Sequence, residues 1–212
     1  MNPLLLRRRG MMQAGGGTPL PYDSKIEYLQ RLNTTSAYID TGIVPTNTHG
    51  IYLYVEPLST ADVYICGLRK DSGNTRWCIG YFGGSSNAYF GWGSLNTNLN
   101  NTFTKGELAL NFQNSRHFTV KQEGGVELTS STLSTLSFST TLTIFLFGYN
   151  RYGSVNPTSQ KLYACKISNG STIILDLIPV RIGTVGYMYD RVSGQLFGNS
   201  GTDSFVLGPD VQ

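Results

Sequence analysis

The sequence predicts an all-β fold, an antiparallel sandwich of two stacked sheets, from its composition and its turn spacing. Charged residues make up 14% of the 212 residues and aromatic residues 12%, which leaves little material for long helices rich in Glu, Lys, Ala and Leu. Clusters of Gly, Asn, Ser and Pro recur every eight to twelve residues or so, between stretches of β-branched and aromatic residues, as in sandwiches. Apolar residues, at 40%, suffice for a sizeable core.

Turn sequences predict antiparallel pairing in three places. Asn169-Gly170 is the strongest short hairpin signal, and Gly124-Gly125 can also adopt positive φ. Residues 190–194 are rich in turn-forming residues and are predicted to connect a third pair of antiparallel strands. The predicted strand pairs are 117–122 with 126–130, 162–168 with 172–180, and 186–189 with 195–197.

The chain divides into an arm, residues 1–21, and a sandwich domain, residues 22–212. The arm has no core-forming period, and Gly15 to Gly17 make it a flexible tether. Three of the 16 basic residues lie in the arm, so the remaining 13 balance the 13 acidic residues of the domain. A neutral body lacks the clustered cations that neutralise phosphates, so nucleic-acid binding by the domain is not expected.

The arm is predicted to anchor the domain to a virion or surface scaffold protein, or to the chain's own homo-oligomer. Its leucines can bury apolar surface in a partner, and its arginines can pair with an acidic rim. Two alternatives are that the arginines contact packaged nucleic acid and that the arm is a disordered leader with no function. The anchoring residues are Leu4, Leu5, Leu6, Arg7, Arg8 and Arg9.

Three cysteines, Cys66, Cys78 and Cys165, are predicted to be buried free thiols. Their number is odd, and they lack the spacing of a zinc site. At the N-terminus the apolar residues precede the arginines, the reverse of the order in a secretory signal. No window approaches the roughly 18 apolar residues of a membrane span, so neither a signal nor a span is expected.

Segments at both ends of the domain resemble concanavalin A-like (laminin G-like) domains of gut bacterial and phage proteins. The matching segments are 26–30, 37–43, 176–181, 185–190, 192–199 and 205–209, and they bracket residues 24 to 210 or so. The resemblance implies a jelly roll of two antiparallel sheets, one concave, in a group associated with glycan binding, adhesion and particle surfaces. It supplies no binding site, because these motifs are strand and turn signatures.

The sequence is not expected to be an enzyme. Glycoside hydrolases need two carboxylates across a cleft, and the Glu-x-Asp-x-x-Glu pattern of related glucanases is absent. Glu123 and Glu127 are the closest pair, but a Gly-Gly turn separates them. His49 and His117 lie next to no recognisable nucleophile motif.

No cofactor is expected, although calcium stays open because several laminin G-like domains bind it. The sequence lacks an Asp-x-Asp-x-Asp loop. Asp62, Asp71, Asp190 and Asp203 each stand among turn residues, where Asp commonly bonds its own backbone.

Two aromatic segments are candidates for glycan binding. Ring faces stack on the C–H surfaces of sugars, while amides and arginines bind hydroxyls. Because side chains alternate along a strand, Trp77 and Tyr81 lie on one face of the strand and Cys78 on the other, and one of these faces must belong to the core. The alternative to glycan binding is that these aromatic side chains fill the core of the sandwich. The segment after the apolar run 142–147 is predicted to be a loop. The candidate residues are Trp77, Tyr81, Tyr89, Trp92, Tyr149, Asn150, Arg151 and Tyr152.

These observations predict a non-catalytic, lectin-like adhesion or display module on the surface of a phage virion or a bacterial cell. The alternative is a structural virion decoration or cement protein that binds only protein. An undetected glycoside hydrolase is the third hypothesis.

Overall fold

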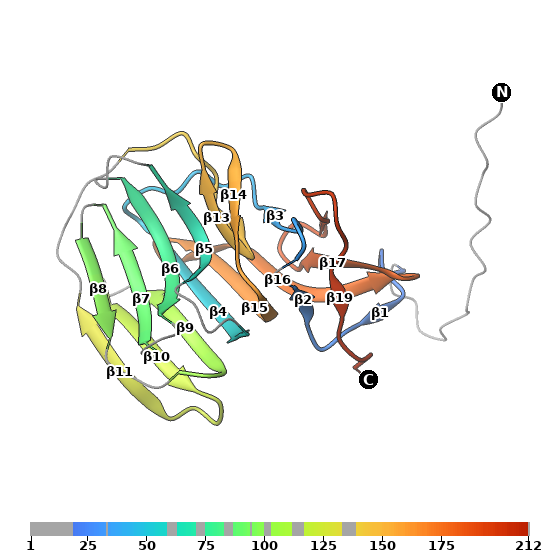
Figure 1. Ribbon diagram of the computed structural model, residues 1–212. Helices are drawn as coiled ribbons and strands as arrows, with labels where there is room; N and C mark the ends of the chain where they lie inside the picture. The colour runs from blue at the N-terminus through green and yellow to red at the C-terminus, as the bar shows by residue number, and fades with distance from the viewer. Residues whose placement is uncertain are drawn as a thin grey trace.

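The computed structural model describes residues 19–32, 34–58, 63–70, 75–82, 87–93, 95–99, 103–111, 117–132 and 139–211. These residues form two β-sheets and no helix (Figure 1), which confirms the predicted all-β sandwich. Among the described strand pairs, only β13 with β5 is parallel. No helix in the described ranges could cross a membrane.

The first sheet has 11 strands and extends beyond the sandwich. In Figure 1 it backs the second sheet, and β16 then leads away to a smaller group formed with β1, β2, β17 and β19. The order is β11 (Glu127–Thr132), β10 (His117–Gln122), β9 (Gly106–Asn111), β4 (His49–Pro57), β15 (Gln160–Asn169), β16 (Thr172–Ile182), β17 (Val185–Asp190) and β18 (Leu196–Phe197), with β1 (Ser24–Lys25), β2 (Leu29–Arg31) and β19 (Val206–Leu207) beside it.

The second sheet has eight strands and carries most of the aromatic residues that the sequence singled out. Its order is β14 (Ser154–Pro157), β13 (Gly148–Arg151), β5 (Val63–Arg69), β6 (Arg76–Phe82), β7 (Asn87–Trp92) and β8 (Leu95–Leu99), with β12 (Phe145–Leu146) joining β5 to β3 (Ile39–Asp40).

The three predicted hairpins are confirmed. β15 pairs with β16 across Asn169-Gly170, where Gly170 has φ 57°. β10 pairs with β11 across Gly124 and Gly125, at φ 88° and 83°. β17 pairs with β18 across the loop that Asp190 begins. Glycine adopts positive φ at little steric cost, so the local sequence favours these turns.

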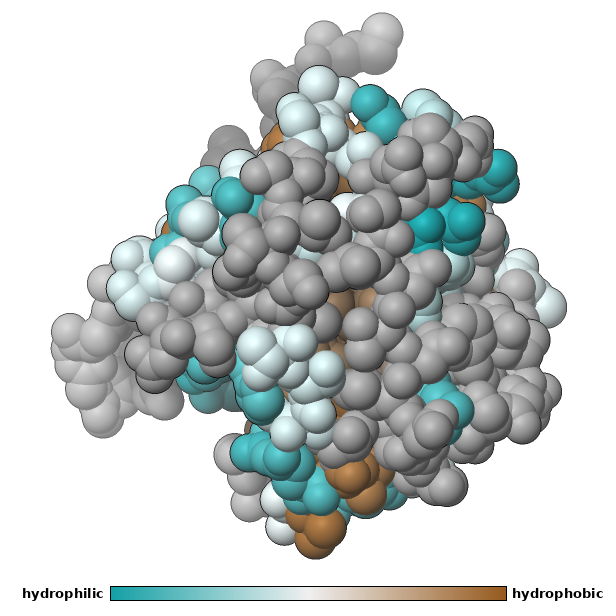
Figure 2. Space-filling view, turned by 90° about the vertical axis from the view of Figure 1, so that its left-hand side faces the viewer, coloured by the Kyte–Doolittle hydropathy of each residue, from teal (hydrophilic) through white to brown (hydrophobic). Residues whose placement is uncertain are grey.

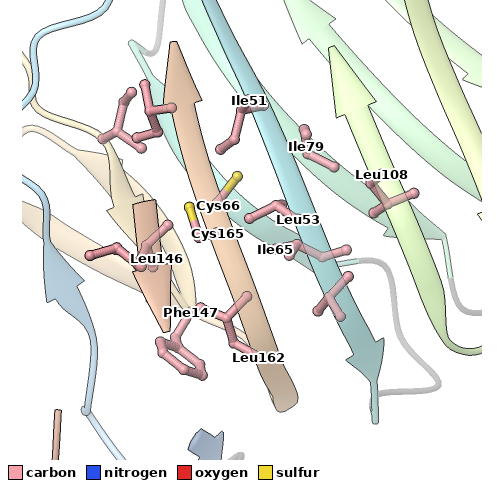
Figure 3. Close-up of a cluster of buried hydrophobic side chains, with 14 of the residues drawn as sticks. Ile51, Leu53, Ile65, Cys66, Ile79, Leu108, Leu146, Phe147, Leu162 and Cys165 are labelled. Atoms are coloured by element: carbon pink, nitrogen blue, oxygen red, sulfur yellow. The ribbon is translucent and has the colours of Figure 1, made fainter. Parts of the chain in front are cut away.

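The core lies between the sheets and includes two of the three cysteines. Figure 3 shows Cys66 and Cys165 among Leu53, Leu146 and Leu162. All three cysteines are free and buried, as predicted. Burial raises the pKa of each thiol, that of Cys78 to about 12, so they remain protonated and unreactive at neutral pH.

The side of the molecule that carries β8 and β11 has a largely polar described surface. Figure 2 shows mainly hydrophilic and intermediate residues there, with hydrophobic residues gathered at the lower end. Isolated exposed apolar side chains such as Val126, at 64% exposure, are ordinary on a protein surface.

Asp190 organises the loop between β17 and β18. It is 1% exposed. Its carboxylate accepts hydrogen bonds from the backbone N–H groups of Asp176 (2.8 Å), Val192 (3.1 Å) and Ser193 (2.9 Å). Burial raises the pKa of Asp190, but the Ser193 hydroxyl and these N–H groups outweigh it and hold the pKa below 3.8.

Asp190→Asn should lower the free energy of unfolding at neutral pH by about 1–3 kcal/mol, because an amide cannot satisfy all these donors. A lowered folded-state pKa stabilises the protein above the unfolded pKa, and the benefit disappears as pH falls through the folded value. The difference between wild type and variant should therefore shrink below a pH near 3.8. Urea unfolding at several pH values measures this, and a difference independent of pH would contradict the assigned role.

Candidate functional site

The aromatic residues of β6 and β7 divide between the two faces of the second sheet. Trp77 lies opposite Trp92, and Tyr81 lies opposite Ala88. Trp77 and Trp92 are 0% exposed and Tyr81 is 8% exposed, all within the core. Their ring faces pack between the sheets and cannot stack on a sugar, so the prediction that they bind glycan is corrected in favour of the core alternative.

Tyr89 and Tyr149 lie together on the outer face of this sheet, on either side of Tyr64. The ring centroids are 5.7 Å apart for Tyr64 and Tyr89 and 4.5 Å for Tyr64 and Tyr149, both edge to face. Arg76 Nη1 donates to the Tyr89 hydroxyl at 3.0 Å, and Arg69 Nη1 donates to the Tyr64 hydroxyl at 2.7 Å. Because Tyr89 and Tyr149 are each 4% exposed, they offer little ring surface to a ligand.

The segment Tyr149 to Arg151 is strand β13 rather than the predicted loop. Asn150 is 3% exposed and structural: its Nδ2 donates to the Thr143 carbonyl at 3.0 Å, and its Oδ1 accepts from Gly153 N–H at 2.8 Å. Arg151, the last residue of β13, and Tyr152, in the following turn, are exposed, Tyr152 by 56%. A binding role for these two stays a prediction.

The anchoring residues Leu4, Leu5, Leu6, Arg7, Arg8 and Arg9 lie outside the described residues, as do Asp62 and Asp71. Asp203 accepts from Ser36 N–H at 2.5 Å rather than from its own turn. Within the described ranges, no three His, Cys, Asp or Glu side chains are grouped so as to hold a metal ion.

A cleft of about 440 Å³ lies on the outer face of the first sheet, where the sandwich meets its extension. This volume falls within the range of small-molecule sites, about 300–1,000 Å³. No sequence motif marks the cleft, because its residues are scattered along the chain. They are Lys25, Ile26, Glu27, Tyr54, Lys105, Glu123, Tyr163, Ile178, Pro179, Arg191 and Val211.

Two tyrosines form the aromatic wall of this cleft. Tyr54 and Tyr163 are partly buried, with ring centroids 5.1 Å apart and planes at 60°. The register of β15 against β4 shifts between Leu162 and Ala164, so that Tyr163 is the extra residue of a β-bulge. Leu162 faces the core opposite Val55, so the next residue, Tyr163, lies on the outer face beside Tyr54. The extra residue then returns Cys165 to the core opposite Leu53.

Lys105 and Glu123 form the polar part of the same wall. Lys105 Nζ lies 2.6 Å from Glu123 Oε1 and 4.6 Å from the centroid of the Tyr163 ring. The Tyr54 hydroxyl donates to Glu123 Oε1 at 3.0 Å, and the Tyr163 hydroxyl donates to Glu56 Oε2 at 2.7 Å. Backbone pairing supports the arrangement, since Glu123 N–H donates to the Lys105 carbonyl at 2.8 Å.

These contacts fix the protonation states of the cleft. The hydrogen bonds from Lys105 and Tyr54 lower the pKa of Glu123, and the bond to Glu123 raises the pKa of Lys105. Burial and the bond to Glu56 raise the pKa of Tyr163. At neutral pH the cleft therefore offers a carboxylate acceptor, an ammonium donor and two neutral rings, which together suit an amphipathic, hydroxyl-rich ligand.

No family model matches the sequence, and no curated protein matches it. Among solved structures, the chain is similar to a protein from Bacteroides ovatus ATCC 8483 described as a "putative carbohydrate binding protein". The TM-score is 0.59 at 9% identity, covering 87% of this chain and 60% of that one. The chain thus spans about 60% of the length of that protein, and the likeness shows a shared β-sandwich fold.

Proposed function

We propose that this chain is a non-catalytic glycan-binding module of the concanavalin A-like (laminin G-like) kind. The cleft carries the proposal: Tyr54 and Tyr163 supply ring surface, and the ionised Lys105–Glu123 pair supplies a donor and an acceptor beside it. The shared fold with a protein described as binding carbohydrate supports the same class of ligand.

Glu123, which lines the cleft, and Glu56, which accepts a hydrogen bond from Tyr163 beside it, favour binding over hydrolysis. A glycosidase needs a general acid whose pKa is raised, so that it is protonated when it meets the leaving group. The pKa of Glu123 is lowered by its hydrogen bonds from Lys105 and Tyr54. Burial raises the pKa of Glu56, but its bonds from Tyr163 and Lys161 outweigh this and lower it. Both groups stay ionised and serve as acceptors.

Screening the full chain against an array of bacterial, plant and animal glycans tests the proposal. Retention of at least one glycan class is expected, with no release of reducing sugar on prolonged incubation. Absence of binding across the array would contradict the glycan-binding role and leave a protein-binding decoration role. Release of reducing sugar would instead show a hydrolase.

The second part of the proposal is that residues 1–21 hold the module on a phage virion or a bacterial cell surface. The described contacts of the domain start just after this arm, where Tyr22 packs against Tyr189 at 5.0 Å between centroids and Asp23 N–H donates to the Arg181 carbonyl at 2.9 Å. Nothing in these contacts needs the arm's leucines or arginines.

Deleting residues 1–21 should leave the melting temperature of the domain nearly unchanged and abolish its incorporation into its particle or oligomer. Calorimetry and gel filtration or virion assembly measure the two effects. A variant with Arg7, Arg8 and Arg9 replaced by Ala and Leu4 to Leu6 intact separates the ionic contribution to anchoring from the apolar one. Normal incorporation of the deletion variant would rule the anchor out.

A further inference from the structure

The charges around the cleft are balanced. Lys105 pairs with Glu123 at 2.6 Å, and Arg191 pairs with Asp176 at 2.7 Å. Lys25 and Glu27 are both exposed and lie two residues apart, so they share one face of their extended segment. The lining thus carries three cations, Lys25, Lys105 and Arg191, and two carboxylates, Glu27 and Glu123. The charge of Arg191 is compensated by Asp176, which lies outside the lining.

Glu123 and Lys105 present an acceptor and a donor side by side. The Glu123 side chain is 55% exposed. Its Oε1 accepts a hydrogen bond from Tyr54, whereas its Oε2 makes no hydrogen bond within the part of the chain that the structure describes. A carboxylate has about four acceptor positions and an ammonium three donors, so both groups retain capacity. Neighbouring hydroxyl groups of a sugar can each donate and accept a hydrogen bond, so they can bind Glu123 and Lys105 together.

An acidic ligand does not match it. A ligand carboxylate that approaches Lys105 would also approach Glu123, because the two are 2.6 Å apart. Like charges brought together at a binding site are unfavourable and serve to exclude the wrong ligand. Glu123 therefore disfavours uronates and sulfated or sialylated sugars.

The rest of the lining is apolar. Ile26, Ile178, Pro179 and Val211 line the cleft together with the rings of Tyr54 and Tyr163. A ligand that fits between these groups has C–H surface as well as hydroxyls.

We infer that this cleft binds a short neutral saccharide and discriminates against acidic ones through Glu123. The inference rests on the proposed glycan-binding function and names its site and ligand class.

Calorimetric titration of the full chain tests the inference with pairs of oligosaccharides that differ only in the oxidation state of C6, for example gluco-oligosaccharides against oligoglucuronates and galacto-oligosaccharides against oligogalacturonates. The neutral member of at least one pair should bind about tenfold or more tighter than its uronate counterpart. Its affinity should change less than about twofold between about 20 mM and about 500 mM NaCl, because no net charge is screened.

Two variants assign the effect to the cleft. Glu123→Lys removes the repulsive carboxylate and should shift preference towards the uronates. Glu107→Gln is the matched control: Glu107 accepts from the Tyr52 hydroxyl at 3.1 Å, much as Glu123 accepts from Tyr54, but does not line the cleft. The control should leave the preference unchanged.

The outcomes separate the inference from the proposed function. Uronate preference in the wild type, steep salt dependence, or sugar binding unaffected by Glu123→Lys would overturn the inference while glycan binding stands. Failure of every saccharide, neutral or acidic, would overturn the proposed function and the inference with it. Circular dichroism of each variant shows that the fold is retained.

Discussion

Replacing Trp77 by alanine is expected to lower the free energy of unfolding by about 3–5 kcal/mol, the cost of truncating a large buried aromatic side chain. Trp77 is 0% exposed and lies opposite Trp92 on the inner face of the second sheet. Removing its ring leaves a cavity between two sheets that are held apart by the remaining side chains. Urea unfolding followed by circular dichroism measures the loss.

Val126→Ala is the control for Trp77→Ala, because Val126 is 64% exposed and should change stability by less than about 0.5 kcal/mol. A loss for Trp77→Ala as small as that of the control would show that the ring is not core, and would restore Trp77 as a candidate for ligand contact.

Replacing Tyr163 by alanine is expected to weaken glycan binding by about 30-fold or more, the effect of losing a central aromatic contact worth about 2 kcal/mol. Tyr163 lies at a β-bulge beside Tyr54 and lines the cleft. Tyr163→Phe keeps the ring but loses the bond to Glu56, so its effect should be smaller. Titration with the glycan found by the array measures both affinities.

Tyr52→Ala is the matched control for Tyr163→Ala. Tyr52 lies on β4, two residues from Tyr54, and its hydroxyl donates to Glu107 at 3.1 Å, but it does not line the cleft. Equal losses of affinity in the two variants would place the glycan site elsewhere on the first sheet. No loss in either would move it to another surface, such as the turn that exposes Tyr152.

The sequence was sufficient where a structural feature depends on neighbouring residues. Asn169-Gly170 and Gly124-Gly125 specify their hairpins because glycine adopts positive φ at no steric cost. The apolar run 142–147 enters the core, since residues 144–147 are all buried. It did not reveal that Tyr149 to Arg151 continue as strand β13, because pairing with β14 and β5 is a tertiary contact.

By itself, the sequence determined the fold class, the hairpins and the two-residue period that sets Trp77 and Cys78 on opposite faces of their strand. The tertiary structure decided which of those faces is core, because that depends on where the other sheet packs. The tertiary structure also creates the cleft, since the lining residues Lys25, Tyr54, Glu123 and Tyr163 are far apart in the chain. They meet because β15 lies between β4 and β16, β1 pairs with β16, and the register of β15 against β4 sets Tyr163 beside Tyr54. Such long-range pairing follows from the packing energy of the whole sandwich, which no local pattern encodes.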